Sequence, residues 1–325
     1  MEVSVAVGTR AGVPPEDELR MAALADQLGY GELWIGEGWA WDAFVLATAL
    51  GVATQRIPIT VGPLAVHVRD PATIARAAAS TAALVRRPVG VALGTSSRRV
   101  VEGMHGRSRQ RPTATLAESA RAVRAFLGEG EAHMDGEVVS TGYRLRFDPP
   151  GGPLTIAAFG DRAVAVAAEH ADRMVLDLVS PELAREYRTK LEGMGRRVGR
   201  KAPRLAAWIP AAVDPTPGSY AQIMHSLAGY LEVAGYAEMF TAAGFGEAVE
   251  AARAGADPDV VLATLPAKAA ATVGLVGDAR TVSARLDAYA EALDELVLVP
   301  ATAGDPVGER TLTALAGMDH PARRA

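Results

Sequence analysis

The sequence predicts an α/β protein built as a single (β/α)8 TIM barrel. Three observations predict it. Short β-branched runs alternate with Ala-rich amphipathic runs, the alternation yields eight strands, and 325 residues suit one barrel. A doubly wound open sheet is the competing architecture, but Gly8-Thr9-Arg10-Ala11-Gly12 matches its Gly-x-Gly-x-x-Gly fingerprint poorly. No Gly-, Pro- or Ser-rich linker divides the chain, so residues 1–325 are expected to form one domain.

Each predicted strand is a short apolar run next to a helical pattern. The strands are expected at residues 3–8, 32–36, 57–61, 89–94, 154–157, 174–178, 205–213 and 295–299. The helices are expected at residues 14–28, 41–54, 71–84, 113–127, 162–170, 181–198 and 279–293. Local signals support these boundaries: Asp70 is a suitable N-cap, Pro71 suits the first helical position, and Gly29 and Gly128 end the helices before them.

Two segments interrupt this alternation of strands and helices. In residues 129–153, Gly, Asp and Pro punctuate two short candidate strands at 137–139 and 143–147, which predicts a hairpin insertion after the fourth unit. Residues 215–267 are mostly helical and too long for one crossover, so we expect a helical insertion before the last strand.

Composition excludes several classes of function. The net charge of −5 argues against a nucleic-acid partner. The absence of cysteine excludes disulfides, thiolate nucleophiles and Cys-type zinc sites, and no two of the six histidines have the i, i+4 spacing of a helical metal site. No signal peptide and no apolar run of membrane-spanning length is found, so a cytoplasmic protein with no membrane partner is expected.

In a barrel, the chemistry lies at the carboxyl ends of the strands. Glu37, Trp39, Trp41 and Asp42 follow the second predicted strand. A carboxylate beside two indoles has the surroundings of an acid or base catalyst, so Glu37 is the candidate catalytic residue. For Asp42 a local capping role is an equal alternative. Trp39, Trp41 and Asp177, which ends the sixth strand, are candidates for binding the substrate.

Two further loops are candidates for binding phosphate. Gly94-Thr95-Ser96-Ser97 is small and rich in donors that can cradle an anion, although an ordinary turn would have the same composition. Phe159-Gly160-Asp161-Arg162 leads into a helix N-terminus, where N–H groups favour an anion and Arg162 can add a charged contact. Asp161 itself is expected to cap that helix.

Cations are concentrated in one loop of this acidic protein. Residues 98–111 contain Arg98, Arg99, Arg107, Arg109 and Arg111, with Glu102 as the only acid. Such a loop suits an extended polyanionic ligand, although for any single arginine a solvated surface position is the alternative.

Together these segments resemble the luciferase-like monooxygenase superfamily, and within it the coenzyme F420-dependent oxidoreductases. The resemblance covers nearly the whole chain, and the order and spacing of its segments are more specific than any one of them. It is carried by residues 28–37, 56–62, 68–71, 93–97, 102–106, 156–162, 171–173, 276–279 and 294–298.

The resemblance implies that a cis peptide after the third strand backs the ring of the cofactor. The matching bond here is Gly62–Pro63, followed by Leu64, although the base rate of X-Pro bonds alone would favour trans. It also implies that the loops at 94–97 and 159–162 hold the side chain and phosphate of the cofactor. The segment 215–267 is expected to shape the substrate entrance, and a homodimer is expected because barrels of this family often dimerise.

This chain departs from the family at two positions. Gly38 stands where many F420-dependent relatives have a histidine, and Ser97 stands where some sugar-phosphate dehydrogenases have a glutamate. These departures favour reduction of a small organic substrate by reduced F420, with Glu37 or water supplying the proton. An FMN-dependent monooxygenase and a non-catalytic flavin-binding barrel are the alternatives. The arginine-rich loop favours F420, whose tail is long and anionic.

Overall fold

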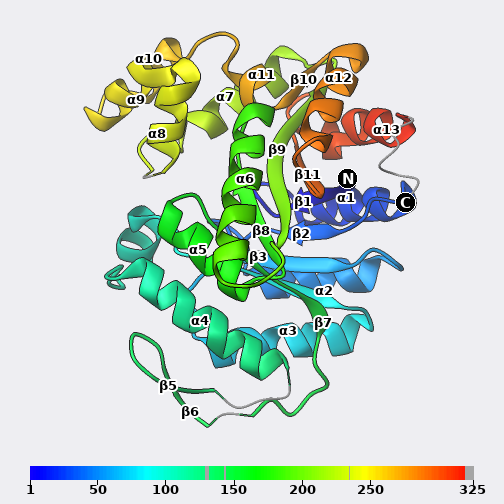
Figure 1. Cartoon of the computed structure of the whole chain (residues 1–325). Coiled ribbons are helices and arrows are strands. Elements are labelled where there is room, and N and C mark those ends of the chain that lie inside the picture. Colours follow the sequence, from blue (N-terminus) through cyan, green and yellow to red (C-terminus); the bar gives the residue numbers. More distant parts are fainter. Residues whose placement is uncertain (129–131, 143, 234, 319–325) are drawn as a thin grey trace.

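The computed structural model describes residues 1–128, 132–142, 144–233 and 235–318 (Figure 1). Its centre is a closed barrel of eight parallel strands, since β8 pairs with β9, β9 with β11 and β11 with β1. The strands are β1 (Glu2–Val7), β2 (Leu33–Ile35), β3 (Ile59–Ala65), β4 (Val89–Gly94), β7 (Gly151–Ala157), β8 (Arg173–Asp177), β9 (Arg204–Val213) and β11 (Glu295–Pro300). The predicted barrel is confirmed.

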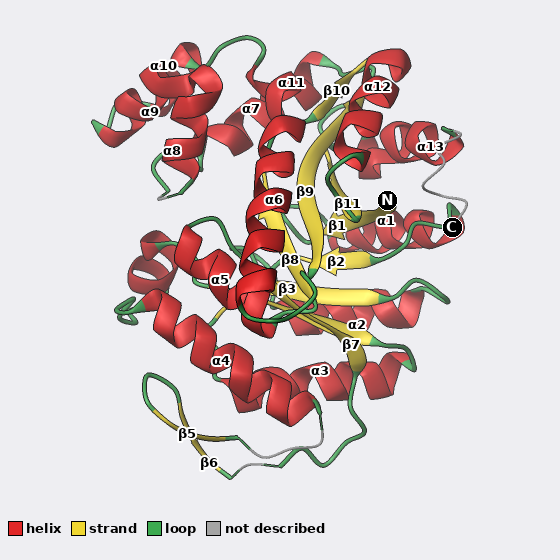
Figure 2. Ribbon diagram, viewed as in Figure 1, coloured by secondary structure: helices red, strands yellow, loops and turns green. Residues whose placement is uncertain are grey.

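Helices cover the outside of the strands (Figure 2). They are α1 (Pro15–Gln27), α2 (Ala43–Ala53), α3 (Pro71–Val85), α4 (Pro112–Leu127), α5 (Asp161–His170), α6 (Pro181–Arg197), α12 (Ala279–Ala290) and the C-terminal α13 (Glu309–Gly317). As expected, Asp70 caps α3 by accepting a hydrogen bond of 2.9 Å from the backbone N–H of Thr73, and Pro71 begins the helix. The main core lies between strands and helices, with Ile35, Leu50 and Ile74 fully buried in it.

A hairpin lies between α4 and β7, but its strands begin earlier than predicted. β5 (His133–Asp135) pairs antiparallel with β6 (Val139–Thr141), whereas residues 144–147 belong to no strand. The expected start at Tyr143 lies outside the described residues. The Asp135–Gly136 pair explains the shift, because Asp-Gly favours a tight turn and therefore places the strands on either side of itself.

The helical insertion consists of α7 (Pro217–Ala228), α8 (Tyr236–Phe240), α9 (Gly246–Arg253), α10 (Pro258–Thr264) and α11 (Ala269–Val273). It has an apolar core of its own that includes Leu227, Phe240 and Phe245, and α8, α9 and α10 form a lobe to one side of the barrel (Figure 1). The short strand β10 (Leu275–Gly277), which pairs with the end of β9, was not predicted because three residues are too few to show a period.

Side chains that point into the barrel fall into three layers, because alternate residues of a strand face the same side. The bottom layer is polar and consists of Ser4, Glu32, Thr60, Thr155, Arg173 and Glu295. The middle layer is apolar and consists of Ala6, Trp34, Ala92, Val175, Ala206 and Val297. The top layer, which we call the mouth, follows at the carboxyl ends of the strands, with Gly36, Gly62, Gly94, Ala157, Asp177, Trp208 and Val299.

Candidate functional site

One half of the mouth is lined by very small residues. Gly36, Gly62, Gly94 and Ala157 come from four neighbouring strands, β2, β3, β4 and β7. A Cβ atom on Gly94 would lie 3.3 Å from the Cβ atom of Pro63 and 3.6 Å from that of Ala157. Glycine allows a ligand to approach the backbone closely. This half of the mouth, which we call the floor, therefore presents backbone where larger side chains would otherwise stand.

The floor contains the predicted cis peptide. The Gly62–Pro63 bond is cis, and the pairing of β3 with β4 shifts register between Val61 and Leu64. Gly62 has a φ of +121°, and a Cβ atom there would lie 2.3 Å from the carbonyl oxygen of Ala92, so only glycine fits. Leu64 is fully buried in the core outside the barrel, and so only its backbone is near the mouth.

The loop after β4 is held in shape by Arg109. The Nε of Arg109 donates to the carbonyl oxygens of Thr95 and Ser96 at 3.2 and 2.8 Å, and its Nη2 donates to the Thr95 hydroxyl at 3.0 Å. Ser96 adopts the left-handed conformation with a φ of +53°. The Ser97 hydroxyl accepts a hydrogen bond of 3.3 Å from the N–H of Val100 and so begins the π-helical turn at residues Arg99–Met104.

The expectation that Asp161 caps α5 is wrong. Gly160 is the N-cap residue, and Asp161 lies within the first helical turn with an exposed side chain. There its carboxylate accepts a hydrogen bond of 2.6 Å from Nζ of Lys190 on α6, which lowers the pKa of Asp161. Since no side chain caps α5, its first N–H groups have no side-chain acceptor, and the exposed Arg162 lies beside them. The predicted anion site thus keeps its donors.

Glu37 lies at the mouth but is engaged in an ion pair. The Nε of Arg69 donates to Oε1 of Glu37 at 2.7 Å, and Nη2 of the same guanidinium also bonds to Glu37. Nη2 of Arg69 additionally lies 2.6 Å from Asp42, which caps α2 through the N–H groups of Phe44 and Val45 at 3.0 Å. Of the two roles considered for Asp42, the structure shows the cap, and the hydrogen bond from Arg69 lowers the pKa of its carboxyl group despite partial burial.

The two indoles expected beside Glu37 have different surroundings. Trp39 is 52% exposed, and the guanidinium of Arg99 lies 4.9 Å from the centre of its ring. Trp41 instead packs against the main core. Sequence order alone suggests a carboxylate next to two tryptophans. In the structure the two indoles have different neighbours.

Asp177 has the environment of a titrating group. It is the last residue of β8, and its carboxylate accepts a hydrogen bond of 3.0 Å from the Tyr236 hydroxyl of the helical insertion. Burial raises the pKa of Asp177 to about 7, opposed by the hydrogen bond from Tyr236. Sequence reasoning missed Tyr236, because no local pattern places a residue 59 positions away against the end of a strand.

Three buried polar atoms near the mouth have no hydrogen-bond partner among the described residues: Nε1 of Trp41, Nδ1 of His67 and Nε1 of Trp208. Trp208 lies in register with Asp177 on the neighbouring strand, so strand alternation could have identified it as a mouth residue. Buried polar groups generally have partners.

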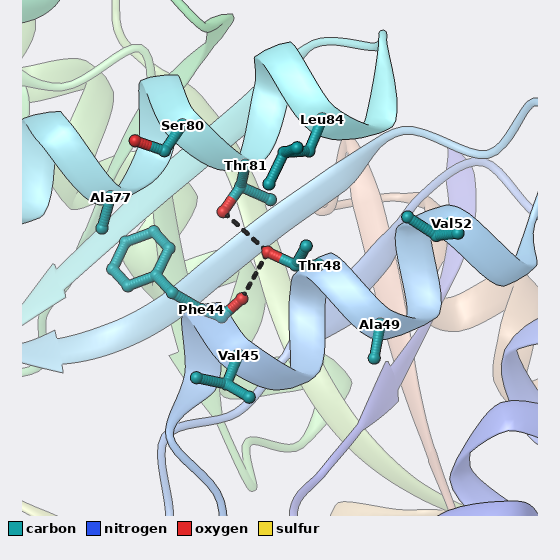
Figure 3. Close-up of a pocket in the computed structure, with 9 residues that line it drawn as sticks. All are labelled: Phe44, Val45, Thr48, Ala49, Val52, Ala77, Ser80, Thr81 and Leu84. Carbon is teal, nitrogen blue, oxygen red and sulfur yellow. Dashed lines mark hydrogen bonds between the residues drawn. The ribbon is translucent and has the colours of Figure 1, made fainter.

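Two other hollows lie away from the floor. A groove between α2 and α3 on the outer surface is lined by six apolar side chains and by the hydroxyl-bearing Thr48, Ser80 and Thr81 (Figure 3). A second hollow lies between α7 and the loops after β1 and β11, beside Arg10, Gln222 and His225. Within the described ranges, no three acidic or histidine side chains gather as a metal site would require. No helix in those ranges combines the length and apolarity needed to cross a bilayer.

The family model described as luciferase-like monooxygenase matches residues 1–296. This chain belongs to that family. It is 26% identical over 221 residues to a Mycobacterium tuberculosis protein whose name assigns it to the coenzyme F420-dependent oxidoreductases. That match covers 62% of this chain and 63% of the relative, so the chain spans less than two thirds of that protein.

Two solved structures show the shared fold. The F420-dependent tetrahydromethanopterin reductase of Methanopyrus kandleri superposes with a TM-score of 0.79 at 16% identity, covering 98% of each chain. The oxygenating constituent of 3,6-diketocamphane monooxygenase from Pseudomonas putida, in complex with FMN, superposes with a TM-score of 0.68 at 16% identity, covering 99% of this chain and 98% of the other. Relatives of this chain therefore include users of either cofactor.

Proposed function

We propose that this protein is an F420-dependent oxidoreductase that transfers a hydride between the deazaflavin and a small organic substrate. The observation that carries the proposal is the mouth of the barrel, where a floor of glycine and alanine faces Asp177 and Trp208. A floor without bulky side chains suits a planar tricyclic ring. When bound, the deazaflavin supplies or accepts the hydride.

The arginine-rich loop favours F420 over FMN. Arg109 holds the β4 loop, Arg99 lies over Trp39, and Arg111 pairs with Glu137 of the hairpin at 2.5 Å. Arg98 and Arg107 form no ion pair with any described residue. Their charge is free for a second anionic group beyond the first phosphate, which the oligoglutamate tail of F420 has and FMN does not.

Under this proposal, different segments of the chain bind different parts of the cofactor and the substrate. Gly62, Pro63 and Gly94 back the ring, the segments 94–97 and 159–162 hold the side chain and phosphate, and the helical insertion closes over the substrate. An FMN-dependent monooxygenase is the second candidate, because the same fold binds FMN in the monooxygenase from Pseudomonas putida.

The test is a titration of the purified protein with oxidised F420 and, in parallel, with FMN, followed by intrinsic tryptophan fluorescence. We expect micromolar binding of F420 and weak binding of FMN. Tight binding of FMN alone would favour the monooxygenase, and binding of neither would overturn the proposal. Binding of F420 without hydride exchange to any acceptor would leave a non-catalytic cofactor-binding barrel.

We also propose that the chain forms a homodimer through the outer face of α2 and α3. All nine residues that line the groove there are uncharged, α2 has no charged residue along its length, and Val45, Val52 and Leu84 are 64–69% exposed (Figure 3). A helix that is apolar on all sides is normally buried, and a neutral face is complementary to a second copy of itself. Light scattering should show a dimer that Val52→Glu dissociates and the control Val260→Glu, on α10, does not. A monomeric wild-type protein would contradict this.

A further inference from the structure

The mouth contains two carboxyl groups that could exchange a proton with a bound substrate, Glu37 and Asp177. Glu37 is already engaged by a cation, because its Oε1 accepts two hydrogen bonds from the guanidinium of Arg69. Among the described residues no cation pairs with Asp177, and its side chain accepts a hydrogen bond from a neutral donor, the hydroxyl of Tyr236.

Asp177 points toward the axis of the barrel. Arg173, four residues earlier on β8, donates hydrogen bonds across the barrel to Glu32 and Glu295, so the odd-numbered residues of this strand face inward. Asp177 therefore faces the mouth one layer above Val175. Its partner in register on β9 is Trp208, whose indole Nε1 is buried and unpartnered among the described residues.

An aromatic cluster encloses the carboxyl group from the side of the insertion. The ring of Tyr236 lies 4.5 Å from that of Phe159, 4.9 Å from that of Tyr230 and 6.1 Å from that of Phe240. Phe159 belongs to the predicted cofactor loop and is fixed by the Tyr187 hydroxyl, which donates to its carbonyl oxygen at 2.8 Å. The cluster thus connects the cofactor loop, the end of β8 and the insertion.

The titratable groups that face Asp177 are phenols. Tyr236 and Tyr230 come from the insertion, and Tyr187 on α6 lies behind Phe159. Burial raises the pKa of Tyr236 well above its usual range, so Tyr236 remains a hydrogen-bond donor at neutral pH. Burial raises the pKa of Asp177 to about 7, which suits a group that both donates and accepts a proton near neutrality.

We propose that Asp177, positioned by Tyr236, is the catalytic acid and base of the reaction, and that its substrate is a carbonyl compound with an apolar substituent. This rests on the proposed function above. In reduction, the O–H bond of the Asp177 carboxyl group breaks and a new O–H bond forms on the carbonyl oxygen of the substrate. A bound reduced deazaflavin would supply the hydride, with its two electrons, to the carbonyl carbon. The carboxylate that remains accepts a hydrogen bond from the Tyr236 hydroxyl and regains a proton from solvent. Oxidation of the alcohol would reverse each transfer. Phe159, Tyr230 and Tyr236 form the apolar wall for the substituent.

The first readout needs no cofactor. In protein labelled with ¹³C at the aspartate carboxyl carbons, we expect one resonance that titrates near pH 7, is lost in Asp177→Asn, shifts its midpoint in Tyr236→Phe and is unchanged in Glu37→Gln. An Asp177 resonance that titrates below pH 5 overturns the proposal.

The second readout is reduction of acetone, cyclohexanone and acetophenone by reduced F420 across pH 5–9. We expect Asp177→Asn to bind oxidised F420 like the wild type while kcat at pH 7 falls at least about 100-fold, as for loss of a general acid. Glu37→Gln should lose less than about fivefold, and Tyr236→Phe should move the pH profile. Full kcat in Asp177→Asn, or reduction of none of the three ketones, overturns this inference. The proposed function is unaffected by either result as long as the protein binds F420. Binding of no cofactor overturns both.

Discussion

The two ends of the barrel interior differ in the size and charge of the side chains that line them. At the bottom, Arg173 lies between the carboxylates of Glu32 and Glu295 at 2.6 and 2.5 Å and donates to the hydroxyls of Thr60 and Thr155. At the mouth, glycines and one alanine from four adjacent strands present backbone in place of large side chains. The bottom layer satisfies its own polar groups, whereas the mouth leaves Nε1 of Trp208 without a described partner.

Each end also has a carboxyl group that titrates near neutrality. Burial raises the pKa of Glu32 to about 7 despite the attraction of Arg173, and burial raises that of Asp177 to about 7 as well. Glu32 is sealed inside a closed network, but Asp177 faces the open end of the barrel. A raised pKa alone therefore does not identify a functional group, and access to a ligand distinguishes the two.

The largest expected effect comes from breaking the bottom layer. Arg173→Met would leave Glu32 and Glu295 buried without their counter-charge, so unfolding should cost about 3–5 kcal/mol less than in the wild type. Urea denaturation at pH 7.5 measures this. Adding Glu32→Gln and Glu295→Gln to the same variant should recover much of the loss. If Arg173→Met unfolds like the wild type, the bottom layer does not have the stabilising role assigned to it.

Filling the mouth should affect binding instead of stability. The γ-carbons of Gly94→Val would project over the floor beside Pro63 and Ala157, and we expect the affinity for F420 to fall at least about 100-fold, or roughly 2.7 kcal/mol. Fluorescence titration measures the affinity, and the melting temperature checks the fold. Gly193→Ala, in an open position on α6, is the control and should bind normally. Normal binding by Gly94→Val would place the ring elsewhere.

Removing a phosphate contact should have a smaller effect. Arg162→Ala takes away a charge beside the uncapped N-terminus of α5 and should weaken F420 binding by about 1–3 kcal/mol. The loss should shrink at high salt because the contact is partly solvated. Arg253→Ala, on the insertion helix α9, is the matched control. An unchanged dissociation constant in Arg162→Ala would move the phosphate site away from α5.

The last prediction is the pH dependence of stability at Asp177. Its folded pKa is raised, so protonation favours the folded state, and stability is lost as the pH rises from about 4 to about 7. Relative to the wild type, Asp177→Asn should therefore gain stability across that window and no more above it, by about 1.4 kcal/mol for each unit by which the pKa is raised. Parallel urea denaturation at pH 4.5, 6 and 8 measures the difference. A constant difference at all three values would contradict the raised pKa.

Much of the site could be located from the sequence because the carboxyl ends of parallel strands converge. Counting strands was enough to place Gly62, Gly94, Phe159 and Asp177 at one end of the barrel, and the cis bond at Gly62–Pro63 followed from the family resemblance. The Asp161 cap was wrong because the helix begins one residue earlier than expected, at Asp161 itself with Gly160 as its N-cap, which leaves the carboxylate to reach Lys190. The hairpin strands were misplaced because alternation alone does not choose between neighbouring apolar runs.

The sequence by itself determined the barrel, the small residues at its mouth and the arginine-rich loop beside it, since strand periodicity and local turn chemistry are properties of neighbouring residues. The tertiary structure alone decided which charges meet. Glu37 is paired because Arg69 follows the next strand of the barrel, and Asp177 is left without a cation because Tyr236 arrives from the insertion instead. The protonation of a carboxyl group depends on burial and on partners distant in sequence, and only the folded chain brings these together.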